Sequence, residues 1–337
     1  MKEFSASKSS RRSLSSGLIF LLATAMVAVA CGVSSPAWCG NSFLTVADTG
    51  NDRIVFTDER GKVIASLTDL PSPVGVAPDS SNNLWVSVLG NLTFPAGLLE
   101  YSQTQLANLG KNPNPTPQAV LFGSIFVEPG GLAFNTQGTL WAADQSGSIF
   151  GFNSSLLSAG SKTNVTPSIT ITSSSFFNQP KFPVFDKNDN LWISDAHNFG
   201  KLYEFQASDL FSSGDKVPAV VLSDNGGSLN APGQLNFDNK GNLWVPNSGD
   251  TSISIFGPGQ LVTGAPIPNV TIESSIIDEP EGAVFSSGKF YTAVLKDDVV
   301  AVFGRTSKKK TPKVKVVISG LLNDPSQMGT STFPLHH

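Results

Sequence analysis

The stretch Asp186-Lys-Asn-Asp-Asn-Leu-Trp192-Ile-Ser-Asp195 belongs to a motif that this chain repeats about six times. A second clear copy is Asp238-Asn-Lys-Gly-Asn-Leu-Trp244-Val-Pro-Asn247. The remaining copies are centred on another large aromatic residue or on none: Trp85, Trp141, Tyr291 and the stretch Leu44–Asp48. The period is roughly 40 to 56 residues, which indicates a solenoid, a propeller or another repeat array.

Each repeat contains four short strand signals. The first strand begins at a proline, where no ladder hydrogen bond is lost: Pro73, Pro129, Pro180, Pro232 and Pro280. A turn rich in Asp, Asn and Gly leads to the Leu-Trp strand, and a third strand ends in an aromatic residue: Tyr101, Phe152, Phe205, Phe256 and Phe303. The fourth strand is a β-branched run introduced by another proline: Pro117, Pro167, Pro218, Pro268 and Pro312. We expect this outermost strand to be an edge, where an opening proline hinders pairing.

The two ends of the chain determine the number of repeats. Four strands per repeat is the pattern of a propeller blade. Residues 43–67 supply only three strands, whereas the C-terminal stretch from Asp324-Pro325 supplies an isolated first strand. Together they complete one blade. The sequence therefore predicts an all-β, six-bladed β-propeller of four-stranded blades, formed by a single domain at 41–337, with one blade closed by strands from both termini. A closed ring needs no partner for its structure, so we expect a monomer.

The N-terminus has the pattern of a secretory signal peptide. A positively charged region is followed by an apolar stretch from Gly17 to Ala30, too short for a permanent membrane helix. We assign 1–30 to the signal peptide, with cleavage as late as about residue 40. The mature protein is then secreted, periplasmic or extracellular. Three alternatives stay open for Cys31: it carries a lipid anchor, it forms a disulfide with Cys39, or it is removed with the leader.

Composition argues against two classes of partner. The chain has 337 residues and a formal net charge of −4, and no basic stripe interleaved with aromatics, so nucleic acid is not expected. The dense basic run Lys308-Lys309-Lys310 lies between two strand signals and is interpreted as a solvated loop. After the leader, no apolar run is long enough to span a membrane.

Two resemblances follow from the motifs. The first copy, Leu44-Thr-Val-Ala-Asp48-Thr-Gly-Asn51-Asp-Arg53-Ile-Val-Phe56, resembles an NHL repeat. The Asp-Asn-Leu-Trp-Ile motif is similar to strands of the SMP-30/gluconolactonase family, another six-bladed group. The latter resemblance implies a divalent metal near the channel, held by a Glu, an Asn and an Asp. The positions that would fill those roles are Glu128, Asn178 or Asn230, and Asp278.

Propeller geometry predicts that polar residues gather at one mouth of the central channel. The first strand starts on the face where the second strand ends, so two groups of residues converge there. One group flanks the leading proline: Glu128, Gln179, Lys181, Asn230, Asp278, Glu279, Glu281 and Asp324. The other group ends the second strand: Asp48, Asp144, Asp195 and Asn247, with Val88 and Val294 in the remaining blades. His197 follows Asp195 closely and is a candidate general base or a plain surface residue.

These residues support two interpretations. Carboxylate and amide oxygens suit Ca²⁺ or another divalent cation, and such a site can polarise an ester or lactone carbonyl. Alternatively, an Asp at a strand end accepts backbone N–H bonds from the adjoining turn. No Ser/His/Asp set and no multi-histidine site can be assigned. The leading hypothesis is therefore a non-catalytic propeller that binds a protein, peptide or glycan through one face. The alternative is a divalent-metal-dependent hydrolase of lactones or esters.

Overall fold

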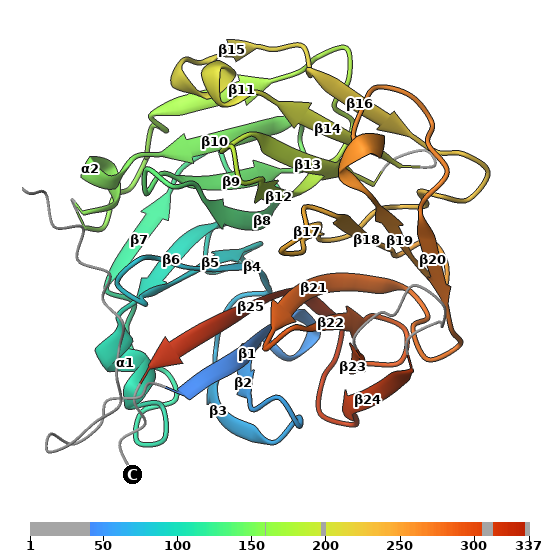
Figure 1. Cartoon of the computed structure of the whole chain (residues 1–337). Coiled ribbons are helices and arrows are strands. Elements are labelled where there is room, and N and C mark those ends of the chain that lie inside the picture. Colours follow the sequence, from blue (N-terminus) through green and yellow to red (C-terminus); the bar gives the residue numbers. More distant parts are fainter. Residues whose placement is uncertain (1–40, 159, 197–199, 305–312, 334–337) are drawn as a thin grey trace, which may run out of the picture. The chain divides into compact units, whose positions relative to one another are not determined.

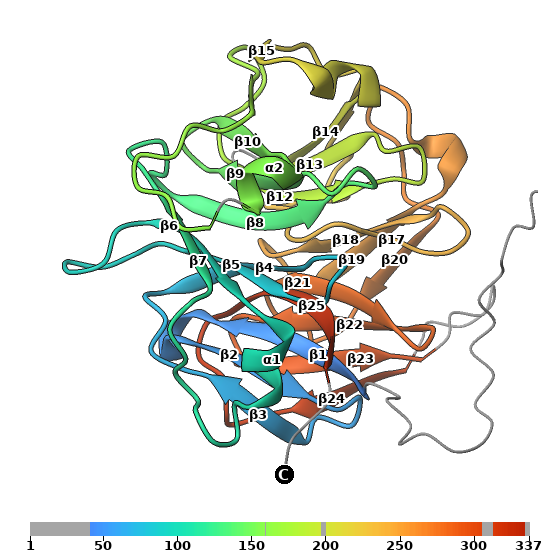
Figure 2. The same cartoon turned by 90° about the vertical axis from the view of Figure 1, so that its left-hand side faces the viewer.

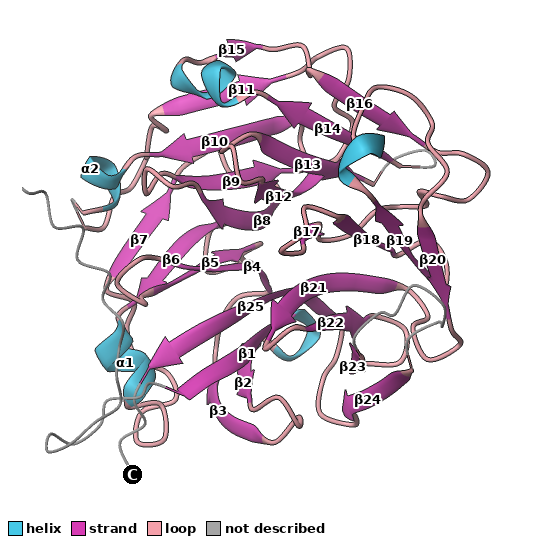
Figure 3. Cartoon of the chain, viewed as in Figure 1, coloured by secondary structure: helices cyan, strands magenta, loops and turns pink. Residues whose placement is uncertain are grey.

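The computed structural model describes residues 41–158, 160–196, 200–304 and 313–333. The chain divides at Trp38/Cys39, and all described residues belong to the unit that runs from Cys39 to the C-terminus. The regular secondary structure of the described residues is almost all strand, with a few short helices, and loops and turns connect these elements (Figure 3). Within these ranges no helix is long and apolar enough to cross a membrane. The signal peptide, Cys31 and Cys39 lie outside the described residues.

The strands form six sheets around a common centre, which confirms the predicted six-bladed β-propeller (Figure 1). The four main strands of each blade pair antiparallel. From the centre outward, blade 1 contains β25 (Pro325–Phe333), β1 (Asn41–Asp48), β2 (Arg53–Thr57) and β3 (Val63–Leu67). In the same direction, blade 2 contains β4 (Pro73–Pro78), β5 (Leu84–Val88), β6 (Gly97–Tyr101) and β7 (Ala119–Phe122). Blade 3 contains β8 (Pro129–Phe134), β9 (Leu140–Asp144), β10 (Ser148–Phe152) and β11 (Ile169–Thr172).

The other half of the ring repeats this order. Blade 4 contains β12 (Pro180–Phe185), β13 (Leu191–Asp195), β14 (Lys201–Phe205) and β16 (Val220–Ser223). Blade 5 contains β17 (Asn236–Phe237), β18 (Leu243–Asn247), β19 (Ser252–Phe256) and β20 (Val270–Glu273). Blade 6 contains β21 (Pro280–Ser286), β22 (Lys289–Val294), β23 (Val299–Phe303) and β24 (Val314–Ile318). The helical segments follow second or third strands: η1 (Thr49–Asn51), α1 (Gln103–Ala107), α2 (Ser154–Leu157), η2 (Ala207–Phe211) and η3 (Pro258–Gln260).

Blade 1 is closed as the sequence predicts. β25 comes from the C-terminal end and pairs antiparallel with β1 from the N-terminal end, over the register Asn41↔Phe333 to Asp48↔Pro325. Figure 2 shows the two strands side by side. Joining the first and last strands in one sheet removes the open edge that a linear array would expose.

The repeated aromatic residue occupies one register in every blade. Each lies opposite the fourth residue after the leading proline, as in Trp85↔Ala77 and Trp192↔Val184, and Thr45 takes that place in blade 1 opposite Gly329. The tryptophans are buried, and three of them pack against a phenylalanine of the next blade. Ring centroids are separated by 6.3 Å for Trp141–Phe185, 6.1 Å for Trp192–Phe237 and 5.4 Å for Trp244–Phe285. The motif therefore supplies contacts that hold neighbouring blades face to face.

The outer edges differ from the sequence prediction in their pairing. In blades 2 to 6 a proline precedes the fourth strand by two residues, as predicted, and in blade 2 the amide between them, Gln118 N–H, already bonds to Glu100 O at 2.7 Å. Several of these edges are nevertheless paired. The loop after the third strand of the next blade forms parallel bridges with them: Leu121↔Lys162, Ile171↔Gly214 and Leu222↔Gly264. In blade 3 this contact forms the extra strand β15 (Gly214–Asp215).

The inner strands approach one another closely where the motif has glycine. A Cβ added at Gly282 would lie 2.2 Å from Ser326 O, and one at Gly233 would lie 2.4 Å from Glu281 O, both on the neighbouring blade. No side chain fits at these distances. The Pro-Gly and Pro-x-Gly elements of the sequence are thus explained by inner-strand packing rather than by turn geometry.

Candidate functional site

The two groups of residues predicted to converge at the channel mouth lie next to one repeated strand pairing. In all six blades the leading proline lies opposite the last residue of the second strand. The pairs are Pro325↔Asp48, Pro73↔Val88, Pro129↔Asp144, Pro180↔Asp195, Pro232↔Asn247 and Pro280↔Val294. The two groups of candidate residues therefore share one face of the ring.

The aspartates that end the second strands are buried and accept bonds from backbone N–H groups. Asp144 is 0% exposed; its Oδ2 accepts bonds from Val127 N–H at 2.9 Å and Glu128 N–H at 3.1 Å, and its Oδ1 accepts one from Ser146 N–H at 3.0 Å. Asp195 is 2% exposed and accepts bonds from Asn178 and Gln179 N–H at 2.7 and 3.1 Å. Each carboxylate thus caps the turn that enters the first strand of its own blade.

Blades 1 and 5 carry variants of this cap. Asp48 accepts a bond from Asn323 N–H at 2.6 Å and forms an ion pair with Arg53 at 2.7 Å. Asn247 accepts one bond from Asn230 N–H at 3.2 Å and donates to Ser252 Oγ at 2.9 Å. In both blades the cap acts on the residue two positions before the proline. The hydrogen-bonding geometry of these second-strand ends is that of a structural cap.

The residue directly before the leading proline is left-handed in four blades. The φ values are 54° for Ser72, 46° for Ala231, 60° for Glu279 and 52° for Asp324. This conformation is uncommon for residues other than glycine, and residues before proline normally favour the β region. It is held by the preceding blade in three cases, for example by the bond from Ser72 N–H to Asp52 Oδ1 at 2.9 Å. Two of the candidate carboxylates at the channel mouth, those of Glu279 and Asp324, therefore belong to residues with a strained backbone.

The structure brings Lys181, Glu281 and Asp324 together. The Lys181 ammonium forms an ion pair with Glu281, between blade 4 and blade 6, and its nitrogen lies 5.3 Å from the Phe182 ring centroid. Gly233 of the intervening blade has no side chain at the same register, where a Cβ would collide with Glu281. Partial burial and the charge of Glu281 raise the pKa of Asp324, while Lys181 opposes the shift.

Beneath the mouth, two glutamines bind the inner strands across blades. Gln327 Oε1 accepts bonds from Val76 N–H and Leu132 N–H, both at 3.0 Å. Gln234 Oε1 accepts bonds from Ala283 N–H at 2.8 Å and Met328 N–H at 2.9 Å. Both residues are buried. Both glutamines lie two residues after the leading proline, where blades 2, 3 and 6 have Gly75, Gly131 and Gly282. Their side chains therefore occupy space near the centre of the ring that the glycines leave open.

The residues suggested as metal ligands come from four different blades and from two different positions. Glu128 lies directly before its leading proline, is exposed and accepts a bond from Gln145 at 3.2 Å. Asn178, Asn230 and Asp278 lie two residues before theirs, and Asp278 forms an ion pair with Lys296 at 2.5 Å. Over the described ranges, no group of three or more His, Cys, Asp or Glu side chains is arranged to hold a metal ion. His197 and the lysine run at 308–310 lie outside the described residues.

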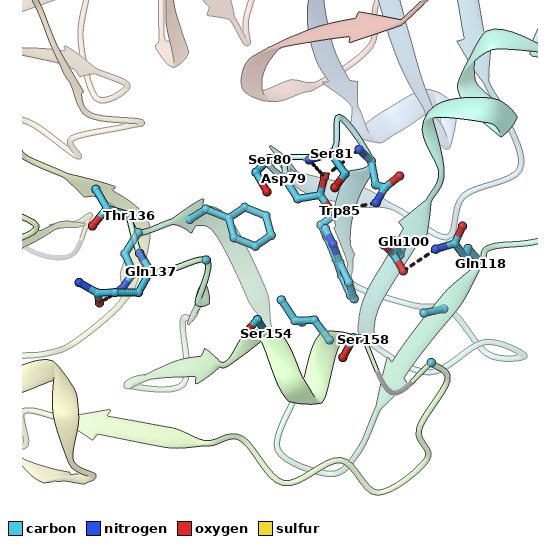
Figure 4. A pocket seen from close by; sticks show the side chains of 17 residues that line it. Asp79, Ser80, Ser81, Trp85, Glu100, Gln118, Thr136, Gln137, Ser154 and Ser158 are labelled. Atoms are coloured by element: carbon cyan, nitrogen blue, oxygen red, sulfur yellow. Dashed lines mark hydrogen bonds between the residues drawn. The ribbon is translucent and has the colours of Figure 1, made fainter. Parts of the chain in front are cut away.

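The opposite face contains a groove that the sequence did not reveal. It lies between blades 2 and 3 and has a volume of about 680 Å³. Trp85 lies at its centre, between the Asp79–Ser81 turn on one side and Ser154 and Ser158 of the α2 region on the other (Figure 4). Glu100 and Gln118 close one end, and Thr136 and Gln137 the other (Figure 4). Carboxylate, amide and hydroxyl groups thus surround an aromatic wall.

A second groove between blades 4 and 5 has the same construction. Its volume is about 450 Å³. Trp192, Glu204 and Asp186 line it at the registers of Trp85, Glu100 and Asp79, and Phe237 takes the place of Phe134. The sequence contained one signal for both, namely a glutamate directly before the third-strand aromatic in Leu-Glu-Tyr101 and Tyr-Glu-Phe205. Only the structure shows that these glutamates border a cavity.

The two glutamates share an electrostatic environment. Burial raises the pKa of Glu100, and the charge of Asp79 raises it further, while a bond from Gln118 opposes the shift. Burial likewise raises the pKa of Glu204, with Asp186 in the role of Asp79. Each groove therefore contains a carboxyl group whose negative charge is not compensated by its surroundings.

Comparison with known proteins extends no further than the fold. No family model matches the chain, and no curated protein sequence does. A chain in the crystal structure of a nidogen/laminin complex superposes with a TM-score of 0.63 at 14% identity, over 86% of this chain and 98% of that one. A functionally unknown protein from Desulfotomaculum acetoxidans gives 0.56 at 13% identity, over 88% of this chain and 100% of that one. A protein of unknown function from Bacteroides caccae gives 0.58 at 9%, over 86% and 98%. These similarities show the propeller fold.

Proposed function

We propose that this protein is an exported, non-catalytic binding module whose ligand enters the grooves between blades. The observation that carries the proposal is the groove of about 680 Å³ around Trp85, Glu100 and Ser158. Cavities of a few hundred cubic ångströms with an aromatic wall and a few polar groups are the usual form of ligand sites. A protein, a peptide or a glycan presents the matching groups.

Two further observations favour binding. The mouth aspartates Asp48, Asp144 and Asp195 already accept bonds from backbone or from Arg53, so their oxygens are engaged in holding the fold. In addition, the similar chain from the nidogen/laminin structure comes from a protein–protein complex. Propellers of unrelated function share this fold, so the proposal depends on the groove and not on the similarity.

The test uses a substitution that fills the groove. Peptide and glycan arrays are probed with the purified propeller, and hits are measured again with Ser158→Trp, because Ser158 is exposed at the groove wall. We expect the hits to weaken at least about tenfold, or 1.4 kcal/mol. Ser275→Trp, at an exposed serine between β20 and β21, serves as the matched control and leaves binding unchanged. Hits that bind both variants like the wild type would contradict the proposal.

The hydrolase alternative makes a different prediction. If Glu128, Asn178, Asn230 and Asp278 hold a divalent cation, Ca²⁺ or another such ion raises thermal stability, by about 2.7 kcal/mol at a hundredfold excess over Kd. The chelator removes the gain, and Glu128→Gln abolishes it. A binding module without this site shows the same melting temperature with metal and with chelator.

A further inference from the structure

We propose that both grooves recognise an organic cation, namely the alkylammonium or guanidinium group of a lysine or arginine side chain in a peptide. The inference rests on the proposed binding function and names the ligand chemistry. It assigns one site to the groove of Trp85, Asp79 and Glu100 and an equivalent site to the groove of Trp192, Asp186 and Glu204.

The first observation is a buried carboxylate without a cation. Glu100 is only 7% exposed, and the hydrogen bond found for its carboxylate comes from Gln118 Nε2 at 3.4 Å. Over the described ranges, neither Glu100 nor Glu204 forms an ion pair. A buried charge is normally paired, because its desolvation is otherwise uncompensated. A positive group in the groove supplies the missing partner.

The second observation is that packing does not demand glutamate at this position. The residue opposite the repeated aromatic is Glu in blades 2 and 4 only, as in Trp85↔Glu100 and Trp192↔Glu204. The other blades have Phe56, Gly151, Ile255 and Val302 at the same register. An apolar residue or glycine therefore satisfies the fold. The two exceptions coincide with the two equivalent grooves between blades, which indicates a ligand rather than a structural need.

A second acidic group is fixed beside each glutamate. Asp79 lies in the turn before β5, where its Oδ1 accepts bonds from Ser81 N–H at 2.8 Å and Asn83 N–H at 2.9 Å. Asp186 accepts the equivalent bonds from Asn188 and Asn190 N–H at 2.8 and 3.0 Å. These bonds hold a negative charge at a defined place near Glu100 and Glu204, and its repulsion contributes to their raised pKa. The lining of the Trp85 groove contains Asp79 and Glu100 and no lysine or arginine, so its charge favours a cation. Lys187 and Lys240 also line the Trp192 groove, where three carboxylates (Asp186, Glu204 and Asp238) leave a smaller negative excess.

The aromatic walls distinguish an organic cation from a metal ion. Phe134 lines one groove and Phe237 the other, and both rings are partly exposed. Trp85 and Trp192 also line the grooves but are only 1% and 2% exposed, so the phenylalanines present the accessible ring surface. Aromatic rings attract ammonium and guanidinium groups and also cover the methylene groups of a long side chain. Volumes of about 680 and 450 Å³ exceed the space of a single ion. A lysine or arginine side chain with part of its backbone uses both the charge and the apolar surface.

Isothermal titration tests the inference with a capped peptide of alternating glycine and lysine as the probe. We expect two sites per chain. Glu100→Gln should remove one and Glu204→Gln the other, each with at least about tenfold weaker binding, or 1.4 kcal/mol. Glu273→Gln neutralises an exposed glutamate at the end of β20 and should change nothing. A thermal melt of each variant shows that it is folded.

The outcomes separate the cation site from the binding module as a whole. Unchanged lysine-peptide binding in the Glu100→Gln/Glu204→Gln double variant overturns the cation site. If array ligands are lost on Ser158→Trp but not on Glu100→Gln, the binding module stands and the cation inference fails. If n-butylammonium binds as tightly as the peptide, the amine chemistry holds but a peptide as its source is overturned. A capped glycine–glutamate peptide that binds equally well would also contradict the inference.

Discussion

The two faces of this ring hold carboxylates in opposite states. On the mouth face, Asp144 and Asp195 are fully enclosed and accept several backbone N–H bonds. On the opposite face, Glu100 and Glu204 have little or no hydrogen bonding, and burial raises their pKa. Burial alone therefore does not indicate a functional acid. What matters is whether the surroundings already compensate the charge.

The largest expected effect breaks a cap on the mouth face. Asp144→Ala removes the acceptor of three partly buried backbone N–H bonds, those of Val127, Glu128 and Ser146, and we expect a loss of about 2–4 kcal/mol in the free energy of unfolding. Urea denaturation measures it. Asp144→Asn is the matched variant, because Asn247 performs the same task in blade 5. It should cost about 1 kcal/mol. Equal losses for both variants would contradict the cap interpretation.

The second-largest effect is expected when the mouth loses the positive charge of Lys181. Lys181→Met leaves Glu281, whose side chain is 4% exposed, without its partner and close to Asp324. Breaking a buried pair from one side costs about 3–5 kcal/mol, and the 21% exposure of Lys181 reduces our expectation to about 2 kcal/mol. Adding Glu281→Gln should restore most of this loss in the same denaturation experiment. A double variant no more stable than Lys181→Met would mean that packing, not charge, accounts for the effect.

On the face that contains the grooves, removal of a carboxylate should stabilise the protein instead of destabilising it. Glu100→Gln removes a buried, uncompensated charge while it keeps the shape of the side chain, so we expect the protein to gain stability, by about 1 kcal/mol or less. Glu204→Gln should behave in the same way, and Glu273→Gln should have no effect. Differential scanning calorimetry at pH 7 measures the shift. Destabilisation by both substitutions would place these glutamates in the same class as Asp144.

The sequence predicted the fold because its repeats encode register. The tryptophan motif fixes which residues pair, and the two incomplete ends reveal the shared blade at β25 and β1. Local signals were less informative where distant segments meet. The paired outer edges depend on loops of the next blade, such as Lys162 beside Leu121. The left-handed Glu279 and Asp324 contradict the usual preference of residues before proline.

The candidate site was only partly accessible from sequence. The strand ends Asp48, Asp144 and Asp195 were placed on one face correctly by strand direction, but their burial and bonding depend on how the preceding turn folds back. Glu100 and Glu204 sit within alternating strands and resemble ordinary polar positions there. Their environment arises from the gap between two blades, which no pattern within one blade describes.

The smallest expected effect is a dependence of folding stability on pH, whose direction should differ between the carboxylates of the two faces. The pKa of Glu100 and Glu204 is raised above the ordinary value of 4.5 by folding, so the native state binds more protons than the unfolded chain between 4.5 and the raised value. Stability from these two groups is therefore lost as the pH rises through that window. The wild type and the Glu100→Gln/Glu204→Gln variant should have equal stability below pH 4.5 and diverge above it, with the variant more stable. Saturating lysine peptide should reduce that difference, because a bound cation favours the charged carboxylates. Melting curves from about pH 4 to about pH 8, with and without the peptide, measure the stability difference between the two proteins. If that difference instead grows toward low pH, the groove carboxylates are compensated like those of the mouth.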